Sequence, residues 1–121
     1  MDWGRSAFSL TLAGAAGCFR LSGEIDMTNA DELLGLLSES LDRDGDMILD
    51  LSELGFIDSS GIQALLRFSR LFDGDRRLIL DSPTGTVGRV LEMVGVEVSE
   101  TLGAQGFPHL EVRHPRVSAT G

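Results

Sequence analysis

Hydrophobic and polar residues follow two distinct periods along the chain, and these periods predict its elements. Residues 8–12 alternate between apolar and polar side chains, as a half-buried strand does. Residues 18–22 follow the small and flexible segment 13–17 and form a second predicted strand. The pattern therefore predicts an opening β-hairpin, and we expect Gly23 to end its second strand.

An amphipathic helix is predicted next. Thr28, with Asp31 three residues later, is typical of an N-cap followed by an acidic first turn. Residues of the expected buried face recur at helical spacing, namely Ala30, Leu33, Leu34, Leu37 and Leu41. We expect the polar segment 42–46, with Gly45 in it, to end this helix.

A buried strand and a second helix follow. The short apolar segment 47–51 is typical of a central strand covered on both faces. Residues 54–57 lead into a helix that starts near Ser59 and is closed by Gly74. On a helical wheel its apolar positions are Ile62, Leu65, Leu66, Phe68, Ser69 and Phe72. Its exposed positions are Ser59, Gln63, Arg67 and Arg70.

The last part of the chain has a weaker pattern. Residues 78–80 predict a third core strand, and Ser82-Pro83 predicts the entry to a helix that Gly95 stops. Residues 98–102 fit either a strand or a helix, and residues 110–112 fit a last strand. The alternation of strands and helices predicts a single α/β domain over residues 1–114, with helices packed on a mixed, mainly parallel sheet of about four or five strands. We expect residues 115–121 to be a disordered C-terminal tail.

Composition excludes several classes of function. The chain has 121 residues, 10 basic and 19 acidic, and all the basic residues are arginine, so its net charge is −9. This charge predicts no direct binding of nucleic acid. The absence of lysine excludes a P-loop lysine and Schiff-base chemistry. Cys18 is the only cysteine, so neither an intramolecular disulfide nor a cysteine-based metal site is expected. The N-terminus lacks a signal pattern and no apolar run approaches the ~18 residues of a membrane span, which predicts a cytoplasmic protein without membrane insertion.

The segment 50–61 carries the most information about function. Asp58, Ser59 and Ser60 occur where a strand and loop become a helix N-terminus. One interpretation is structural: Asp58 or Ser59 caps the helix, and Gly61 permits close packing. The other is regulatory, because a phosphate on an exposed serine at a helix N-terminus would be tolerated by the fold. It would add about −1.5 to −2 of charge to an interface.

The order of the motifs resembles the STAS-domain family, and within it the anti-sigma factor antagonists of bacteria. The matching segments are residues 21–26 (Leu-Ser-Gly-Glu-Ile-Asp), 48–52, 56–61 (Phe-Ile-Asp-Ser-Ser-Gly), the strand at 78 and the helix over 87–95. The resemblance implies a protein that binds an anti-sigma factor with serine-kinase activity and thereby frees a sigma factor. It also implies phosphorylation of Ser59 by that kinase, which ends binding, and its reversal by a PP2C-type phosphatase.

The resemblance further implies which residues face the partner. Asp26 and Asp58 correspond to the acidic residues beside the phosphorylated serine, and the expected surface also includes Met27, Ser60 and Gln63. Arg67 and Arg70 are either ordinary solvated residues or contacts for acidic groups of the partner. No cofactor is expected, and the protein is predicted to be a monomer or a weak dimer.

Other functions remain alternatives. A serine hydrolase needs a positioned base, but the histidines lie near the C-terminus and G-x-S-x-G is absent around Ser59, so we predict that the protein is not an enzyme. A receiver domain resembles this chain in size but requires a late lysine. A non-catalytic STAS adaptor in a stress-signalling complex or a lipid-transport system shares the fold, and the presence of Ser59 favours the phosphorylation switch over it.

Overall fold

A computed structural model describes residues 7–41, 45–102 and 107–113, with residues 94–102 described by their backbone only. Over these residues the chain forms six strands and three helices. They are β1 (Phe8–Leu12), β2 (Cys18–Ile25), α1 (Ala30–Glu39), β3 (Met47–Asp50), β4 (Leu54–Ile57), α2 (Ser59–Ser69), β5 (Leu78–Asp81), α3 (Gly85–Leu102) and β6 (Leu110–Arg113). The predicted tail 115–121 lies outside the described residues.

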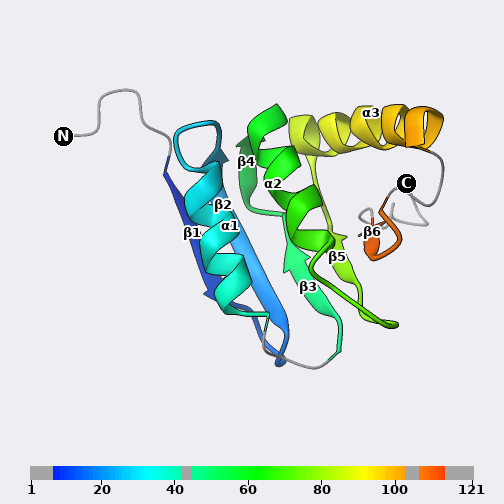
Figure 1. Ribbon diagram of the computed structural model, residues 1–121. Helices are drawn as coiled ribbons and strands as arrows, with labels where there is room; N and C mark the ends of the chain where they lie inside the picture. The colour runs from blue at the N-terminus through cyan, green and yellow to red at the C-terminus, as the bar shows by residue number, and fades with distance from the viewer. Residues whose placement is uncertain (1–6, 42–44, 103–106, 114–121) are drawn as a thin grey trace, which may run out of the picture.

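The strands form one mixed sheet in the order β1-β2-β3-β5-β6 (Figure 1). β1 and β2 are antiparallel, as the predicted hairpin requires, and the other pairs are parallel. β4 lies off this path and pairs with the second half of β2. The predicted fold class is thus confirmed, and β4 is the element that the strand pattern did not predict.

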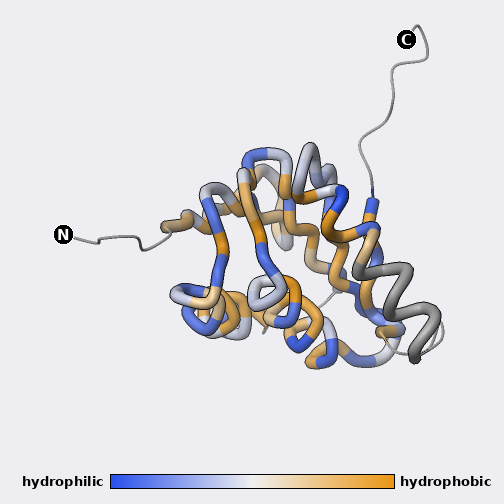
Figure 2. The backbone as a smooth tube through the Cα atoms, turned by 90° about the horizontal axis from the view of Figure 1, so that it is seen from above, coloured by the Kyte–Doolittle hydropathy of each residue, from blue (hydrophilic) through white to orange (hydrophobic). Residues whose placement is uncertain are grey.

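One face of the sheet is covered by α1 and α2, and Figure 2 views both helices nearly end on, on the same side of the strands. The core lies between them, because inward strand residues such as Leu21, Leu49 and Leu80 are fully or almost fully buried, as are Leu33 of α1 and Phe68 of α2. Burying such side chains stabilises the fold by about 1.5–3 kcal/mol each.

The expectation that residues 47–51 are covered on both faces is wrong. Met47 and Leu49 of β3 are buried, whereas Ile48 and Asp50 are half-buried on the opposite face. This alternation indicates a sheet with one packed face and one more open face, although Ile79 of β5, the register partner of Ile48 on that second face, is also buried. On the open face, register aligns four charged residues, Arg20, Asp50, Asp81 and Arg113, across neighbouring parallel strands.

The open face has one carboxyl group with a clearly shifted pKa. Burial opposes ionisation of Asp50, but the backbone N–H and hydroxyl of Ser52 and the guanidinium of Arg20 outweigh it and lower the pKa of Asp50 below its usual value. Arg20 Nε lies 3.1 Å from Asp50 Oδ2, and the Ser52 N–H donates to Asp50 Oδ1 at 2.9 Å.

Gly23 does not end the second strand. β2 continues to Ile25 because its second half finds a new parallel partner in β4, with a shift of register between Gly23 and Glu24. Gly23 adopts φ +97°, and a Cβ there would meet the carbonyl oxygen of Ala7 at 2.3 Å. Glycine is therefore required at this irregularity.

Several predicted helix ends are also wrong. α1 ends at Glu39 with Ser40 as its C-cap, before Gly45, and residues 42–44 lie outside the described part. α2 ends at Ser69 with Arg70 as its C-cap, well before Gly74. Glycine is not needed at either end, because the cap residue stays in the right-handed region and its N–H bonds to carbonyls of the last turn.

The third helix differs most from the prediction. α3 begins at Gly85, after Ser82-Pro83, and continues through Gly95 to Leu102. Residues 98–102, for which a strand and a helix were both open, are therefore helical. A single glycine costs a helix only about 1 kcal/mol, which the rest of a long helix can offset. The last predicted strand is confirmed as β6 beside β5.

Candidate functional site

Two acidic residues lie at the ends of neighbouring parallel strands. In the pairing of β2 with β4, Ile25 stands opposite Ile57, and the next residues along the chain are Asp26 and Asp58. The Asp58 N–H donates to the carbonyl of Ile25 at 3.2 Å. The carboxyl ends of parallel strands meet at one edge of a sheet, so the register brings together two loops that are distant in sequence.

Asp58 is the cap of α2. Its backbone is extended, and its Oδ1 accepts hydrogen bonds from the N–H groups of Ser60 at 2.9 Å and Gly61 at 3.2 Å. Of the two candidate caps that the sequence left open, Asp58 therefore performs this role. Ser59 becomes the first helical residue, and its hydroxyl is not used to hold the helix end.

Gly61 fixes how closely α2 approaches the sheet. A Cβ at Gly61 would lie 2.5 Å from Cγ1 of Ile57 and 2.7 Å from Cγ2 of Ile25. Such distances are too short for any side chain, so the first turn of α2 lies against both strand ends. The close packing expected at Gly61 is confirmed, and it positions Ser59 at the rim of the sheet.

The two serines differ in access. Ser59 is exposed, whereas Ser60 is half-buried. Within the described residues, the hydroxyl of Ser59 has no hydrogen-bonding partner. Ser59 is therefore the more accessible of the two hydroxyl-bearing residues.

The loop before α1 is held by a buried amide. Asn29 is only 5% exposed; its Oδ1 accepts from the N–H of Asp26 at 3.0 Å and its Nδ2 donates to the carbonyl of Glu24 at 2.9 Å. Asp26 Oδ1 accepts from the N–H and the hydroxyl of Thr28, at 2.9 and 2.6 Å. Asn29, and not Thr28, is thus the N-cap residue of α1, although its side chain binds the loop and not the helix.

This bonded loop presents an apolar side chain to solvent. Met27 lies between Asp26 and Thr28 and is 80% exposed. A single exposed apolar side chain is common on a protein surface, so Met27 matters here for its position beside Asp26 and not for its exposure alone.

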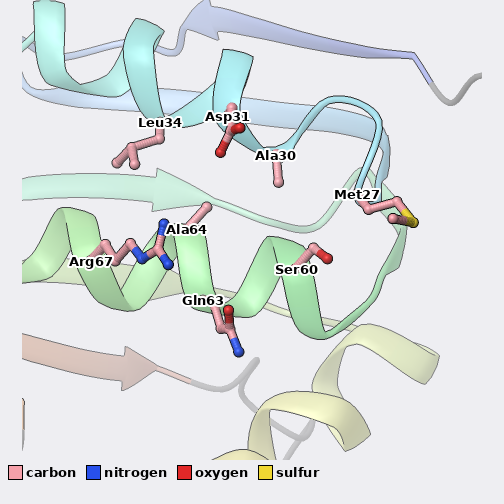
Figure 3. Close-up of a pocket in the computed structure, with 8 residues that line it drawn as sticks. All are labelled: Met27, Ala30, Asp31, Leu34, Ser60, Gln63, Ala64 and Arg67. Carbon is pink, nitrogen blue, oxygen red and sulfur yellow. The ribbon is translucent and has the colours of Figure 1, made fainter.

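A groove of about 240 Å³ runs between α1 and α2 beside this loop (Figure 3). It is lined by Met27, Ala30, Asp31, Leu34, Ser60, Gln63, Ala64 and Arg67. Three of the predicted site residues, Met27, Ser60 and Gln63, are therefore among its lining residues. Asp26, Asp58 and Ser59 belong to the adjoining loops and helix end and do not line it.

Sequence reasoning missed the groove as a site. Its lining residues repeat the same spacing twice, at 27, 30, 31 and 34 and again at 60, 63, 64 and 67. Positions three and four apart lie on one side of a helix. These two sets of residues could have indicated a shared groove. That inference also requires knowing that the two helices lie side by side.

Ser59 and His109 lie near opposite ends of α2. His109 Nδ1 lies 2.8 Å from the carbonyl oxygen of Arg76, and its ring lines a pocket with Ser69 and Arg70. The rise of a helix separates Ser59 from Ser69 by about 15 Å. Within the described residues, then, Ser59 has no imidazole beside it, and His114 lies outside them.

Two other kinds of site are absent from the described part of the chain. None of its helices combines the length and the hydropathy needed to cross a membrane. Its His, Cys, Asp and Glu side chains do not gather in any group of three or more that could hold a metal ion.

Comparison with known proteins agrees with this geometry. The structure of the anti-sigma factor antagonist SpoIIAA in its unphosphorylated form is 25% identical and superposes with a TM-score of 0.57, covering 88% of this chain and 87% of SpoIIAA. An anti-sigma factor antagonist from Mycobacterium paratuberculosis, 22% identical, shares the fold with a TM-score of 0.65 over 92% of this chain and 88% of its own. The family model of the STAS domain matches residues 8–111. The chain therefore belongs to the STAS-domain family.

Proposed function

We propose that this protein is an anti-sigma factor antagonist whose binding is switched by phosphorylation of Ser59. In its unphosphorylated form it binds an anti-sigma factor that is also a serine kinase, and the sigma factor is released. The kinase transfers a phosphoryl group to Ser59 and then dissociates, and a PP2C-type phosphatase restores the free hydroxyl. The protein itself performs no catalysis.

The observation that carries the proposal is the division of roles between Asp58 and Ser59. Asp58 satisfies the N–H groups of the first turn, so the exposed hydroxyl of Ser59 is available for modification without loss of the cap. Negative charge near a helix N-terminus is tolerated electrostatically. A phosphate there can therefore change binding while the fold persists.

The surface around Ser59 supplies a reason for release. Asp26 and Asp58 already make this end of the sheet acidic, and Met27 presents an apolar side chain beside them. A phosphate adds about −1.5 to −2 of charge. Within an interface, that charge must be desolvated or repelled, and binding is lost.

Mass spectrometry of the protein from its native cells tests this proposal. We expect intact mass and peptide mapping to find a phosphate on Ser59 whose occupancy changes between resting and stressed cells. Purified serine-kinase anti-sigma factors of the same organism, assayed as a panel, should include one that phosphorylates Ser59 and binds the unphosphorylated protein. Protein that stays unmodified in cells and in the panel would favour a constitutive STAS adaptor.

A further inference from the structure

Two opposite charges face the groove between α1 and α2 without pairing. Asp31 of α1 and Arg67 of α2 both line the groove, and Figure 3 shows the Asp31 carboxylate directed toward α2 and the Arg67 side chain extended along α2 toward Ala64. Within the described residues, neither side chain has a hydrogen-bonding or ion-pairing partner. Both are exposed.

Most of the other described arginines are engaged. Arg20 pairs with Asp50, Arg77 with Asp46 and Glu111, and Arg113 with Glu111. In a chain of net charge −9, an arginine readily finds a carboxylate. Among the described residues, Arg67 and Arg89 have no ion pair, and of these two only Arg67 lines the groove, which also contains the unpaired carboxylate of Asp31.

The wall between these charges is small and apolar. Ala30 and Leu34 of α1 face Ala64 of α2, and Figure 3 shows all three directed into the groove, whereas Gln63 is turned away from α1. Short side chains on both helices leave room for an inserted group. Figure 3 shows Met27 and Ser60 at one end of the groove, and Ser60 is the chain neighbour of Ser59.

From this arrangement we infer that the groove is a docking site for a segment of the partner protein with matching chemistry. The segment places a carboxylate on Arg67, a basic side chain on Asp31 and a small apolar side chain against Ala30, Leu34 and Ala64. Charge complementarity at two separate points orients the segment in the groove. This inference rests on the proposed function, since its occupant is the kinase that phosphorylates Ser59.

Docking in the groove would place the bound kinase beside its phosphorylation site. A segment seated in it passes beside Ser60 and Met27 and so lies next to the exposed Ser59. Docking then holds the kinase where Ser59 can react, and a phosphate on Ser59 is added at the edge of the bound segment. The charged contacts are also screened by salt, so affinity falls as ionic strength rises.

Charge reversal measured with a matched control tests the inference. The probe is the purified kinase that phosphorylates Ser59, and its affinity for the unphosphorylated protein is measured by calorimetry. We expect Arg67→Glu and Asp31→Arg each to raise Kd about tenfold or more. The control is Arg89→Glu on α3, because Arg89 is exposed and lacks an ion pair within the described residues. It makes the same change of net charge as Arg67→Glu and should leave Kd within about twofold.

The outcomes separate the groove from the switch. Equal Kd values for Arg67→Glu and Arg89→Glu, with binding still abolished by Ser59→Asp, would overturn the docking site and leave the proposed function standing. A panel in which no kinase binds the protein or phosphorylates Ser59 would overturn the proposed function, and with it the occupant of the groove. Circular dichroism of each variant confirms folding, which neither exposed, unpaired side chain is expected to affect.

Discussion

Ile25 and Ile57 stand opposite each other in the parallel pairing of β2 and β4, and the side chains of both lie so close to Gly61 that they would overlap a Cβ there. This pairing positions the residues of the site. It sets Asp26 and Asp58 at the same edge of the sheet, and it leaves room for the first turn of α2 only if residue 61 has no side chain. The position of Ser59 is thus determined by packing beneath it and not by any contact of its own.

Gly61→Ala should destabilise the protein by about 1–3 kcal/mol, since the added methyl overlaps Ile57 and Ile25 and the core must shift. Chemical denaturation measures this loss. Gly35→Ala is the control, because α1 offers open space at that position and alanine is the better helix former. A variant Gly61→Ala as stable as the wild type would show that α2 is not held against the strand ends as described.

Asp58→Ala should cost about 0.5–2 kcal/mol of unfolding free energy, because the N–H groups of Ser60 and Gly61 lose their acceptor. Asp58→Asn keeps an oxygen acceptor and should lose much less. The comparison of the two variants by thermal or chemical unfolding therefore isolates the cap from the charge. Equal losses in both would indicate that the negative charge, and not the hydrogen bonds, stabilises α2.

Much of the fold was predictable because periodicity reports burial. The leucines of α1 have a buried side and β1 alternates half-buried with exposed residues, and both patterns are visible in the sequence. β4 was not predicted because its pattern, Leu54 and Ile57 buried with Gly55 and Phe56 exposed, is too short to show a strand period. The second half of β2, with which β4 pairs, was not predicted either, because Gly23 was expected to end that strand.

The site was predictable only where motif and position coincide. Asp58 and Ser59 could be assigned to a helix N-terminus from the sequence, since caps are local features. The bonds of Asn29 to Glu24 and Asp26 depend on how the loop folds back on itself, which composition does not reveal. The groove depends on α1 lying beside α2, and that is a property of the sheet order.

Asn29→Ala should destabilise the protein by about 1–3 kcal/mol, because the carbonyl of Glu24 and the N–H of Asp26 lose a buried partner. It should also loosen the loop that carries Met27. Hydrogen exchange measured by NMR should therefore accelerate at Asp26 and Thr28 more than in β5. A uniform acceleration would mean that Asn29 supports the whole domain and not this loop.

The open face of the sheet predicts a dependence on pH. The pKa of Asp50 is lowered in the folded protein, chiefly through Ser52 and Arg20 acting against burial. A lowered folded pKa adds stability above the unfolded value of about 3.9, and that stability is lost as pH falls through the folded pKa. Arg20→Gln should raise the Asp50 pKa, as followed by NMR of the carboxyl carbon.

Arg20→Gln also tests whether the ionised form of Asp50 is the one that stabilises the fold. Arg20→Gln should destabilise the protein more at pH 7, where Asp50 is ionised, than in acid well below the folded pKa, where the carboxyl is neutral. Denaturation at the two pH values measures the difference. A loss that is the same at both values would assign the effect to packing of the arginine stem and not to its charge.

Ser59 variants test the switch and the cap at once. Ser59→Asp should abolish binding of the kinase that phosphorylates this site, yet leave the thermal midpoint within a few degrees of the wild type. A helix N-terminus favours the charge by about 0.3–1 kcal/mol, and repulsion from Asp58 acts in the opposite direction. Ser59→Ala has no hydroxyl to accept a phosphate and should bind permanently, and it should stay folded because Asp58 still caps the helix.

Ser60→Ala is the matched control, since it removes the neighbouring hydroxyl and leaves the exposed one in place. It should be phosphorylated and released like the wild type. Phosphate retained on Ser59→Ala would move the modified residue to Ser60, which lies in the groove, and the kinase would then have to reach between α1 and α2. A loss of several kcal/mol of unfolding free energy in both Ser59→Ala and Ser59→Asp would instead make Ser59 a structural residue. The exposure of its hydroxyl could then no longer be explained by regulation through charge at this helix end.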